Sequence, residues 1–162
     1  WISWVGGGNF GVVTEFEFAR HDVGPTVLAG VLISPFEVAR ELLRFHRSFT
    51  ATSPDELCCY ASIRTTPTAS SVPEEVHGER IATMYLCYHG DRETGERAIQ
   101  PLRSFATPIV DLVEPRRYVV FRGMFDDVYL PGFRNYWKSQ FVAEDGLSDA
   151  AMETMVDHTW RR

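Results

Sequence analysis

The 162 residues suit one domain of ordinary size, and the 44% hydrophobic content is enough for a sizeable core. The net charge of −6, with a single lysine, disfavours nucleic acid as a partner, because phosphate neutralisation needs clustered Lys and Arg. The sequence also predicts no membrane-spanning segment and no metal site, because it contains no apolar run of about 18 residues and no His or Cys pair at ligand spacing.

The first segment joins a glycine run to a strand pattern. Gly6, Gly7 and Gly8 precede Asn9, and such a run permits positive φ and lets the backbone approach a ligand closely. A phosphate-binding loop does not fit, because it ends in Gly-Lys-Ser/Thr at the start of a helix. A dinucleotide fingerprint does not fit either, because its glycines lie between a strand and a helix. Apolar and polar residues then alternate over 12–18, which predicts a strand with one buried face.

A turn at Gly24-Pro25 leads into the next two predicted elements. Residues 27–33 are almost continuously apolar, which predicts a central strand paired with 12–18 as a hairpin. Ser34 as N-cap, Pro35 at the first helical position and Glu37 as a capping box predict a helix to about residue 49. Its apolar face is Ala39, Leu42, Leu43 and His46, and we assign its charged face, which carries Arg40, Glu41, Arg44 and Arg47, to solvent.

The remaining elements complete an α+β pattern. Strands are predicted at 57–65 and 80–89, around a polar loop at 67–78, and then at 108–113, 118–123 and 136–142. Helices are predicted after Asp91, with a kink or late start at Pro101, and after Ser148, with Met152, Met155, Val156 and Thr159 facing inward. This order favours an antiparallel β-sheet with helices packed on one face.

The cysteines indicate no disulfide framework. Their number is odd, and Cys58 and Cys59 are neighbours whose side chains point to opposite faces of a strand.

Five short sequence segments resemble the berberine-bridge-like, oxygen-dependent FAD-linked oxidoreductases of the PCMH type. They fall in the order of that family at about its spacing and cover almost the whole chain. The segments are Gly6-Gly7-Gly8-Asn9-Phe10-Gly11-Val12-Val13-Thr14, Cys87-Tyr88-His89-Gly90-Asp91, Ala98-Ile99-Gln100-Pro101-Leu102-Arg103, Pro108-Ile109-Val110-Asp111 and Tyr136-Trp137-Lys138-Ser139.

The resemblance implies a division of the chain and a cofactor. Residues 1–14 would end the FAD-binding domain, and 15–162 would form a substrate-binding α+β domain that is truncated at its C-terminus. The implied FAD contacts are Gly6, Gly7, Gly8, Asn9, Phe10, Gly11, Val12 and Val13. Because the chain starts at Trp1 and the family attaches its flavin in an upstream domain, we interpret the chain as a fragment that is inactive alone and does not hold FAD.

The resemblance also implies the reaction, in which a small organic substrate passes a hydride to FAD and electrons then pass to oxygen. The flavin carries out the redox chemistry, while the protein binds and orients the substrate and supplies a base. We assign no catalytic residue. Candidate substrate-binding residues are Tyr118, Tyr136 and Lys138, and further pocket candidates are Tyr88 and Arg122.

Other interpretations of these residues stay open. Lys138 would be a solvated edge residue if Trp137 and Phe141 belonged to the core. The whole chain could also be a non-catalytic α+β ligand-binding module, or an interaction domain that uses exposed aromatic residues.

Overall fold

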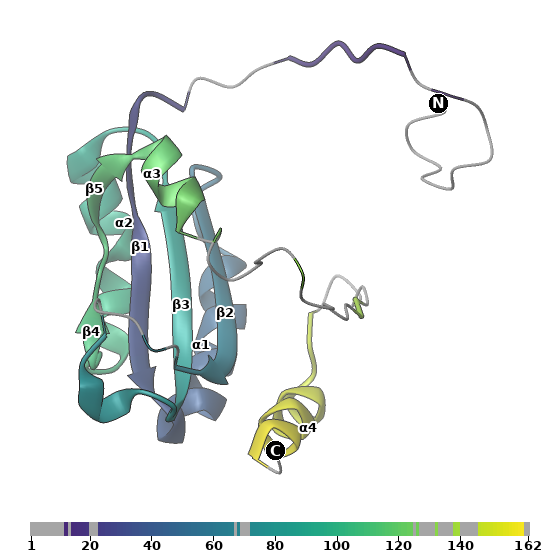
Figure 1. Cartoon of the computed structure of the whole chain (residues 1–162), viewed down its shortest axis with the longest axis vertical. Coiled ribbons are helices and arrows are strands. Elements are labelled where there is room, and N and C mark those ends of the chain that lie inside the picture. The colour runs from purple at the N-terminus through teal and green to yellow at the C-terminus, as the bar shows by residue number, and fades with distance from the viewer. Residues whose placement is uncertain are drawn as a thin grey trace.

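The computed structural model describes residues 12, 14–19, 23–66, 68, 72–124, 126, 132, 138–139 and 146–160. Within these ranges the strands form one antiparallel sheet flanked by helices, as the sequence predicted (Figure 1). The elements are, in chain order, β1 (Thr26–Pro35), η2 (Phe36–Val38), α1 (Ala39–Thr50), β2 (Leu57–Thr65), η3 (Glu74–Val76), β3 (Arg80–Tyr88), α2 (Arg92–Phe105), β4 (Val110–Asp111), β5 (Glu114–Arg117), α3 (Tyr118–Gly123) and α4 (Asp149–Trp160).

Strand β1 lies in the middle of the sheet, as its apolar sequence predicted. Residues 27–34 are all buried, and the sheet order is β2-β3-β1-β4, with β5 also paired to β1. β3 occupies one edge of β1, with Leu28 opposite Tyr88, while β4 and β5 share the other edge. Every pairing is antiparallel, which makes the α+β prediction correct.

The predicted hairpin between 12–18 and 27–33 is wrong for the described residues. Residues 12 and 14–18 belong to no strand and are exposed, with Phe16 at 61% and Phe18 at 76%. Both edges of β1 are already hydrogen-bonded to other strands, so no edge of β1 is left for this segment. The alternating pattern of residues 12–18 therefore does not identify a partner strand in this sheet.

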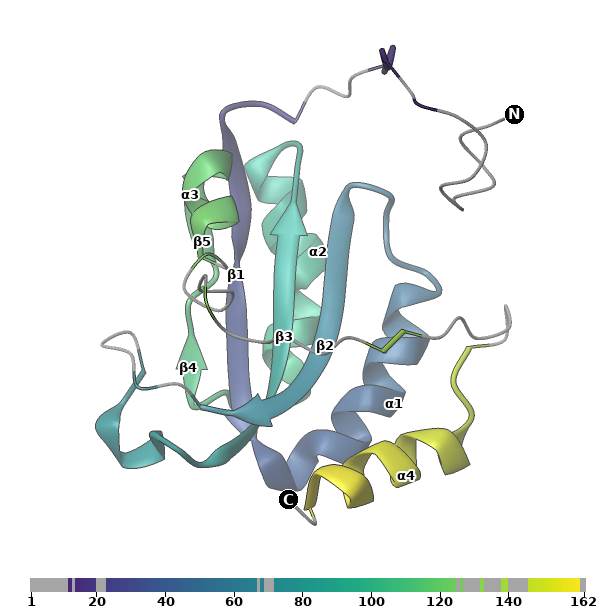
Figure 2. The same ribbon diagram turned by 45° about the vertical axis from the view of Figure 1, so that its right-hand side comes forward.

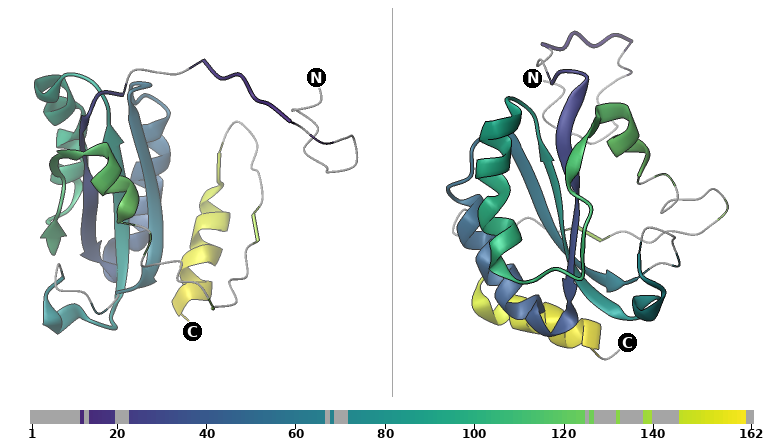
Figure 3. Two further views of the ribbon diagram at one scale, coloured as in Figure 1. Left: turned by 45° about the horizontal axis from the view of Figure 1, so that its top comes forward. Right: turned by 90° about the vertical axis from the view of Figure 1, so that its left-hand side faces the viewer.

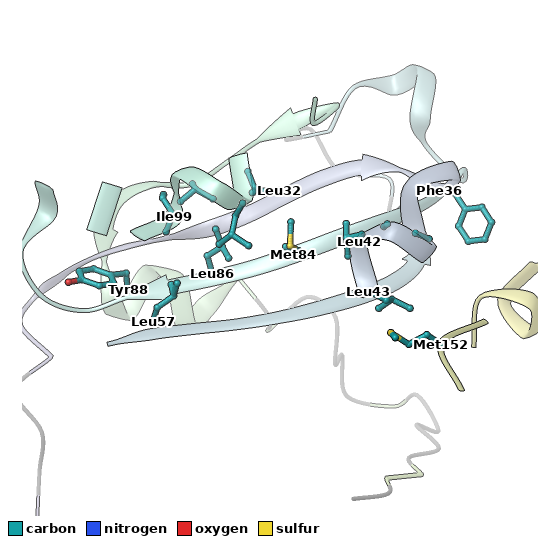
Figure 4. Packing of buried hydrophobic residues seen from close by; sticks show 14 of the residues in the cluster. Leu32, Phe36, Leu42, Leu43, Leu57, Met84, Leu86, Tyr88, Ile99 and Met152 are labelled. Carbon is teal, nitrogen blue, oxygen red and sulfur yellow. The ribbon is translucent and has the colours of Figure 1, made fainter. Parts of the chain in front are cut away.

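One face of the sheet carries the larger core, which α1 and α2 cover (Figures 2 and 3). Side chains alternate along each strand, so β1 places Leu28 and Leu32 on this face, and β3 places Met84 and Leu86 there. Leu42 of α1 and Ile99 of α2 pack onto them and have no exposed surface (Figure 4). Burial on this scale supplies most of the stabilisation of such a domain.

The opposite face of the sheet carries smaller covers than the face under α1 and α2. Helix α3 lies over one part of it, where Phe121 packs beside Val27 and Ala29 (Figure 3). The segment before and within η3 covers another part, through Val72 and Val76. Between these two covers, no helix or strand of the described chain packs on the surface formed by β2 and β3, where Tyr60 is 43% exposed.

The start of α1 differs from the predicted capping box. Ser34 is a buried residue of β1 and pairs with Ala82, so its hydroxyl does not cap the helix. The chain instead passes through η2, and no side chain caps either η2 or α1. The predicted apolar face is confirmed for Ala39, Leu42 and Leu43.

The charged face of α1, which we assigned to solvent, instead holds helix α4. Arg40 pairs with Glu153 and Asp157, and Arg44 pairs with Glu153. Arg47 pairs with Asp149 at 2.8 Å. The side chains are roughly one-third to three-fifths exposed, so each pair adds little by itself and the network mainly sets the position of α4.

The sequence predicted the start of α4 correctly but only part of its packing. The Ala151 N–H donates to the Ser148 hydroxyl at 3.2 Å, which confirms the cap. Met152 and Val156 are buried as predicted, whereas Met155 is 45% exposed.

Helix α3 replaces the strand that the β-branched residues at 118–123 predicted. β5 ends at Arg117, opposite Thr26, which is the first residue of β1. Beyond that point β1 offers no strand partner, so a helix satisfies the backbone of the next residues better than an unpaired strand would. The predicted strand 136–142 lies outside the described residues except for 138–139, which have no regular structure.

Helix α2 begins as predicted and passes through Pro101 without a late start. The Asp91 carboxylate accepts a hydrogen bond from the Thr94 N–H at 2.9 Å and caps the helix, which then runs from Arg92 to Phe105. Gly95 in its first turn allows the helix to lie directly on the ring of Tyr88. A Cβ at this position would be 2.5 Å from the Tyr88 ring.

We therefore predict that Gly95→Ala destabilises the protein. Crowding the ring of the buried Tyr88 costs about 1–3 kcal/mol, which outweighs the helix propensity gain of about 1 kcal/mol. Urea unfolding followed by circular dichroism measures the difference. Gly123→Ala is the matched control, because a Cβ there would meet its nearest atom at 3.7 Å. Equal stabilities of the two variants would contradict the packing argument.

Candidate functional site

The accessible face of β2 and β3 carries an aromatic surface. Residues at every second position of β2 point to this face, among them Cys58, Tyr60 and Arg64, while their neighbours enter the core on the other side. On β3 the corresponding residues are Tyr85 and Cys87. The antiparallel register places Cys58 opposite Cys87 and Tyr60 opposite Tyr85.

Tyr60 and Tyr85 form the central contact of this surface. Their ring centroids are 4.7 Å apart and the rings are inclined by 9°, which is a stacked arrangement. Arg64 Nη1 donates to the Tyr85 hydroxyl at 2.9 Å, which orients the phenol. Tyr60 remains 43% exposed, so one of the rings still presents surface to a ligand.

A cavity of about 260 Å³ lies between these strands and α3. Helix α3 contributes Tyr118, Phe121 and Arg122 to its lining, and the strands contribute the two tyrosines and two cysteines already named, together with Leu86. Phe121 is buried because it anchors α3 to the sheet, whereas Tyr118 is 37% exposed. The lining is thus aromatic on both sides, which suits a small planar molecule.

The charge of the cavity is positive. Arg122 is the guanidinium among the lining residues, and no carboxylate of the described chain is part of the lining. Within the described ranges Arg122 makes no ion pair, whereas Arg116 nearby binds Glu114 at 3.0 Å. An exposed Arg beside aromatic walls can bind a negatively charged group on a ring.

The two faces of β2 give its neighbouring thiols different environments. Burial, with a smaller contribution from Cys58, raises the pKa of the Cys59 thiol to about 12. Cys59 packs against the helix-covered core, and its carbonyl lies 3.2 Å from a ring nitrogen of His46. Burial and then Cys58 also raise the pKa of Cys87. Cys58 is exposed, so it is the accessible thiol of the three.

The structure brings together two of the residues that the sequence analysis proposed for a pocket. Tyr118 and Arg122 both line the cavity. Tyr88 does not, because it points into the core below α2 and is 4% exposed. Lys138 is exposed and belongs to no described strand, and Tyr136 lies outside the described residues. Of the proposed FAD contacts, Gly6 to Gly11 and Val13 lie outside the described residues, and Val12 is 91% exposed.

The sequence analysis missed Tyr60, Tyr85, Cys58 and Cys87 as site residues. Alternation along each strand could have grouped Cys58 with Tyr60, and Tyr85 with Cys87. It could not have chosen the accessible face, because that depends on where α1, α2 and α3 pack.

Two further observations concern the described residues. None of their helices combines the length and apolar character needed to cross a membrane. In the same part of the chain, no three His, Cys, Asp or Glu side chains come together as metal ligands.

Comparison with known proteins relates this chain to a curated enzyme. No family model matches the chain. The chain is similar to an FAD-linked oxidoreductase from Dictyostelium discoideum. The two sequences are 29% identical over 153 residues, which is 93% of this chain. The chain spans about 30% of the length of that relative. This similarity supports a general relationship to FAD-linked oxidoreductases.

We predict that alkylation distinguishes the thiols by the face on which they lie. At pH 8 a thiol with a pKa of about 12 is ionised in roughly one molecule in ten thousand, and the thiolate is the reactive form. Iodoacetamide should therefore label Cys58 first and Cys59 last, as followed by peptide mass spectrometry. Labelling in urea is the control and should remove the difference. Labelling of folded Cys59 as fast as Cys58 would contradict the assigned faces.

Proposed function

We propose that this chain is the substrate-binding part of an FAD-linked oxidoreductase, and that the cavity between α3 and the Tyr60–Tyr85 pair binds the substrate. The observation that carries this proposal is an accessible aromatic cavity with one guanidinium, in a chain similar to an FAD-linked enzyme. We propose further that the enzyme is a berberine-bridge-like oxidase of the PCMH type with oxygen as electron acceptor.

The contents of the cavity indicate the kind of substrate. Tyr60 and Tyr118 offer partly exposed rings, and these favour a flat ring as the ligand. Arg122 at the same cavity favours a negative group on that ring, such as a carboxylate or phenolate. We therefore propose a small aromatic anion, held by the rings and oriented by Arg122.

The size of the cavity separates the substrate from the cofactor. A volume of about 260 Å³ lies below the range of about 300–1,000 Å³ that ligand pockets usually have, so FAD itself would not fit inside. This cavity therefore suits a small substrate and not the whole cofactor. We propose that Gly6 to Val13 contact FAD where this chain meets the flavin domain. When bound, FAD would accept the hydride and pass electrons to oxygen.

A non-catalytic ligand-binding module remains the alternative function. Its supporting observation is the aromatic lining of the cavity, which suits binding of a small ring without any reaction. The two proposals differ in one observable, since a binding module would carry no flavin in the full-length protein.

For the enzyme, we predict that Gly8→Val in the full-length protein lowers flavin content. A β-branched side chain opposes positive φ and prevents close approach of the backbone to the cofactor. The measurement is the ratio of flavin absorbance to protein absorbance in the purified protein. Gly132→Val is the control, because Gly132 also has a positive φ, of 92°, and is not among the proposed FAD contacts, so this variant reports the backbone strain alone. An unchanged flavin content in Gly8→Val would assign the glycine run to packing.

For the cavity, we predict that Arg122→Gln weakens binding of an aromatic anion about tenfold, which is the loss of one charge-assisted hydrogen bond. The probe is benzoate, with neutral benzamide as the comparison ligand, and the measurement is an NMR titration of the 162-residue chain. Arg117→Gln is the matched control, because Arg117 is exposed and does not line the cavity. Equal binding of benzoate by both variants would remove Arg122 from the site.

A further inference from the structure

We infer that Cys58 and Cys87 are a modification site of the cavity, at which the two thiols close reversibly into a disulfide with a low-molecular-weight disulfide as oxidant. All three cysteines are free in the structure. The inference is independent of the proposed function, because it rests on the strand register and on the positions of the sulfur-bearing residues.

The register of β2 and β3 places the two cysteines directly opposite each other. The His89 N–H donates to Glu56 O at 3.1 Å, and the Thr66 N–H donates to Glu79 O at 2.8 Å. These bonds mark both ends of the ladder as hydrogen-bonded pairs. Hydrogen-bonded and non-hydrogen-bonded pairs alternate along an antiparallel ladder. The Cys58–Cys87 pair lies two residues from Glu56–His89, so it is also a hydrogen-bonded pair. The Cα atoms of such a pair are about 5.5 Å apart, which lies within the range of about 4.4–6.8 Å for disulfides. Their Cβ atoms, at about 4.5–5.5 Å, must approach to about 3.5–4.5 Å, so closure requires the two strands to move together locally, and a bond formed in this way is easily reduced.

The side chains of both cysteines reach the same space. Each lines the cavity beside Tyr60 and Tyr85, on the accessible face of the sheet. Cys59 lies on the other face, packed against the core, and the chain contains no further cysteine. Cys58 can therefore pair within this chain only with Cys87, which is also the residue that the strand register places opposite it.

The exposure of the thiols sets the order of the chemistry. The accessible Cys58 thiolate attacks one sulfur of oxidised glutathione, forms a mixed disulfide and releases one glutathione thiolate. Cys87 loses its proton to solvent and attacks the Cys58 sulfur, which releases the second glutathione. Two protein thiols are thereby oxidised, and one glutathione disulfide is reduced to two thiols.

The second step should depend on pH. Burial raises the pKa of Cys87, so less of its thiolate is present at neutral pH, and closure should become faster as pH rises.

The disulfide would act on an edge of the sheet. Among the described strands β2 pairs only with β3, whereas β3 also pairs with β1. A covalent bond at Cys58–Cys87 would join β2 to β3 beside the Tyr60–Tyr85 pair. We expect slower opening of β2 and an altered cavity.

The test is incubation of the 162-residue chain with oxidised glutathione, followed by intact and peptide mass spectrometry. We expect a mass lower by two hydrogens, a crosslink between the peptides that contain Cys58 and Cys87, and full reversal by dithiothreitol. Cys59→Ala is the matched control and should form the same crosslink. Cys58→Ser and Cys87→Ser should each lose it, with circular dichroism confirming that both are folded.

Three results would overturn the inference. They are a mixed disulfide at Cys58 that persists at pH 9, a crosslink that contains Cys59, and a disulfide between two molecules on a non-reducing gel. Hydrogen exchange gives an independent readout, because the amides of β2 should exchange more slowly after oxidation in Cys59→Ala but not in Cys87→Ser. Equal exchange before and after verified closure would overturn the proposed effect on β2.

Discussion

Burial of β1 on both faces and pairing of both its edges is the constraint on which the rest of this structure depends. An extended chain with residues 27–34 buried must have its polar backbone groups hydrogen-bonded, because unpaired groups in an apolar interior are costly. β3 provides these bonds along one edge, and β4 and β5 along the other. Gly30 allows this second edge to be close, because a Cβ there would lie 2.1 Å from the Leu112 carbonyl oxygen.

The two faces of the sheet then take different roles. The face under α1 and α2 holds the larger core, where Leu42 and Ile99 have no exposed surface. Among the described residues, the other face is covered where α3 and the η3 segment reach it, and the aromatic cavity lies beside α3. The position of α3 follows from β5, because β5 ends where β1 begins and the chain must turn there. The residues of the cavity thus come together because strand pairing on β1 ends at that point.

Several sequence predictions were confirmed because their signals are local. The continuous apolar stretch identified β1, the two segments on either side of the polar loop at 67–78 were correctly predicted as β2 and β3, and Asp91 and Ser148 cap helices as predicted. The errors arose where distant residues compete with local preference. Val119 and Val120 favour a strand but lie in a helix, and Ser34 has the chemistry of a cap but is buried in β1.

The sequence by itself determined the α+β class, the central strand and the resemblance to FAD-linked oxidoreductases, because burial patterns, helix caps and motifs are written within short windows of residues. It also pointed to Tyr118 and Arg122. Only the tertiary structure decided that Arg40 and Arg44 bind α4, that Tyr60 stacks on Tyr85, and that Cys58 lies opposite Cys87. The physical reason is that strand register and helix docking join residues that are distant in the chain, and their energies depend on contacts that no single segment contains.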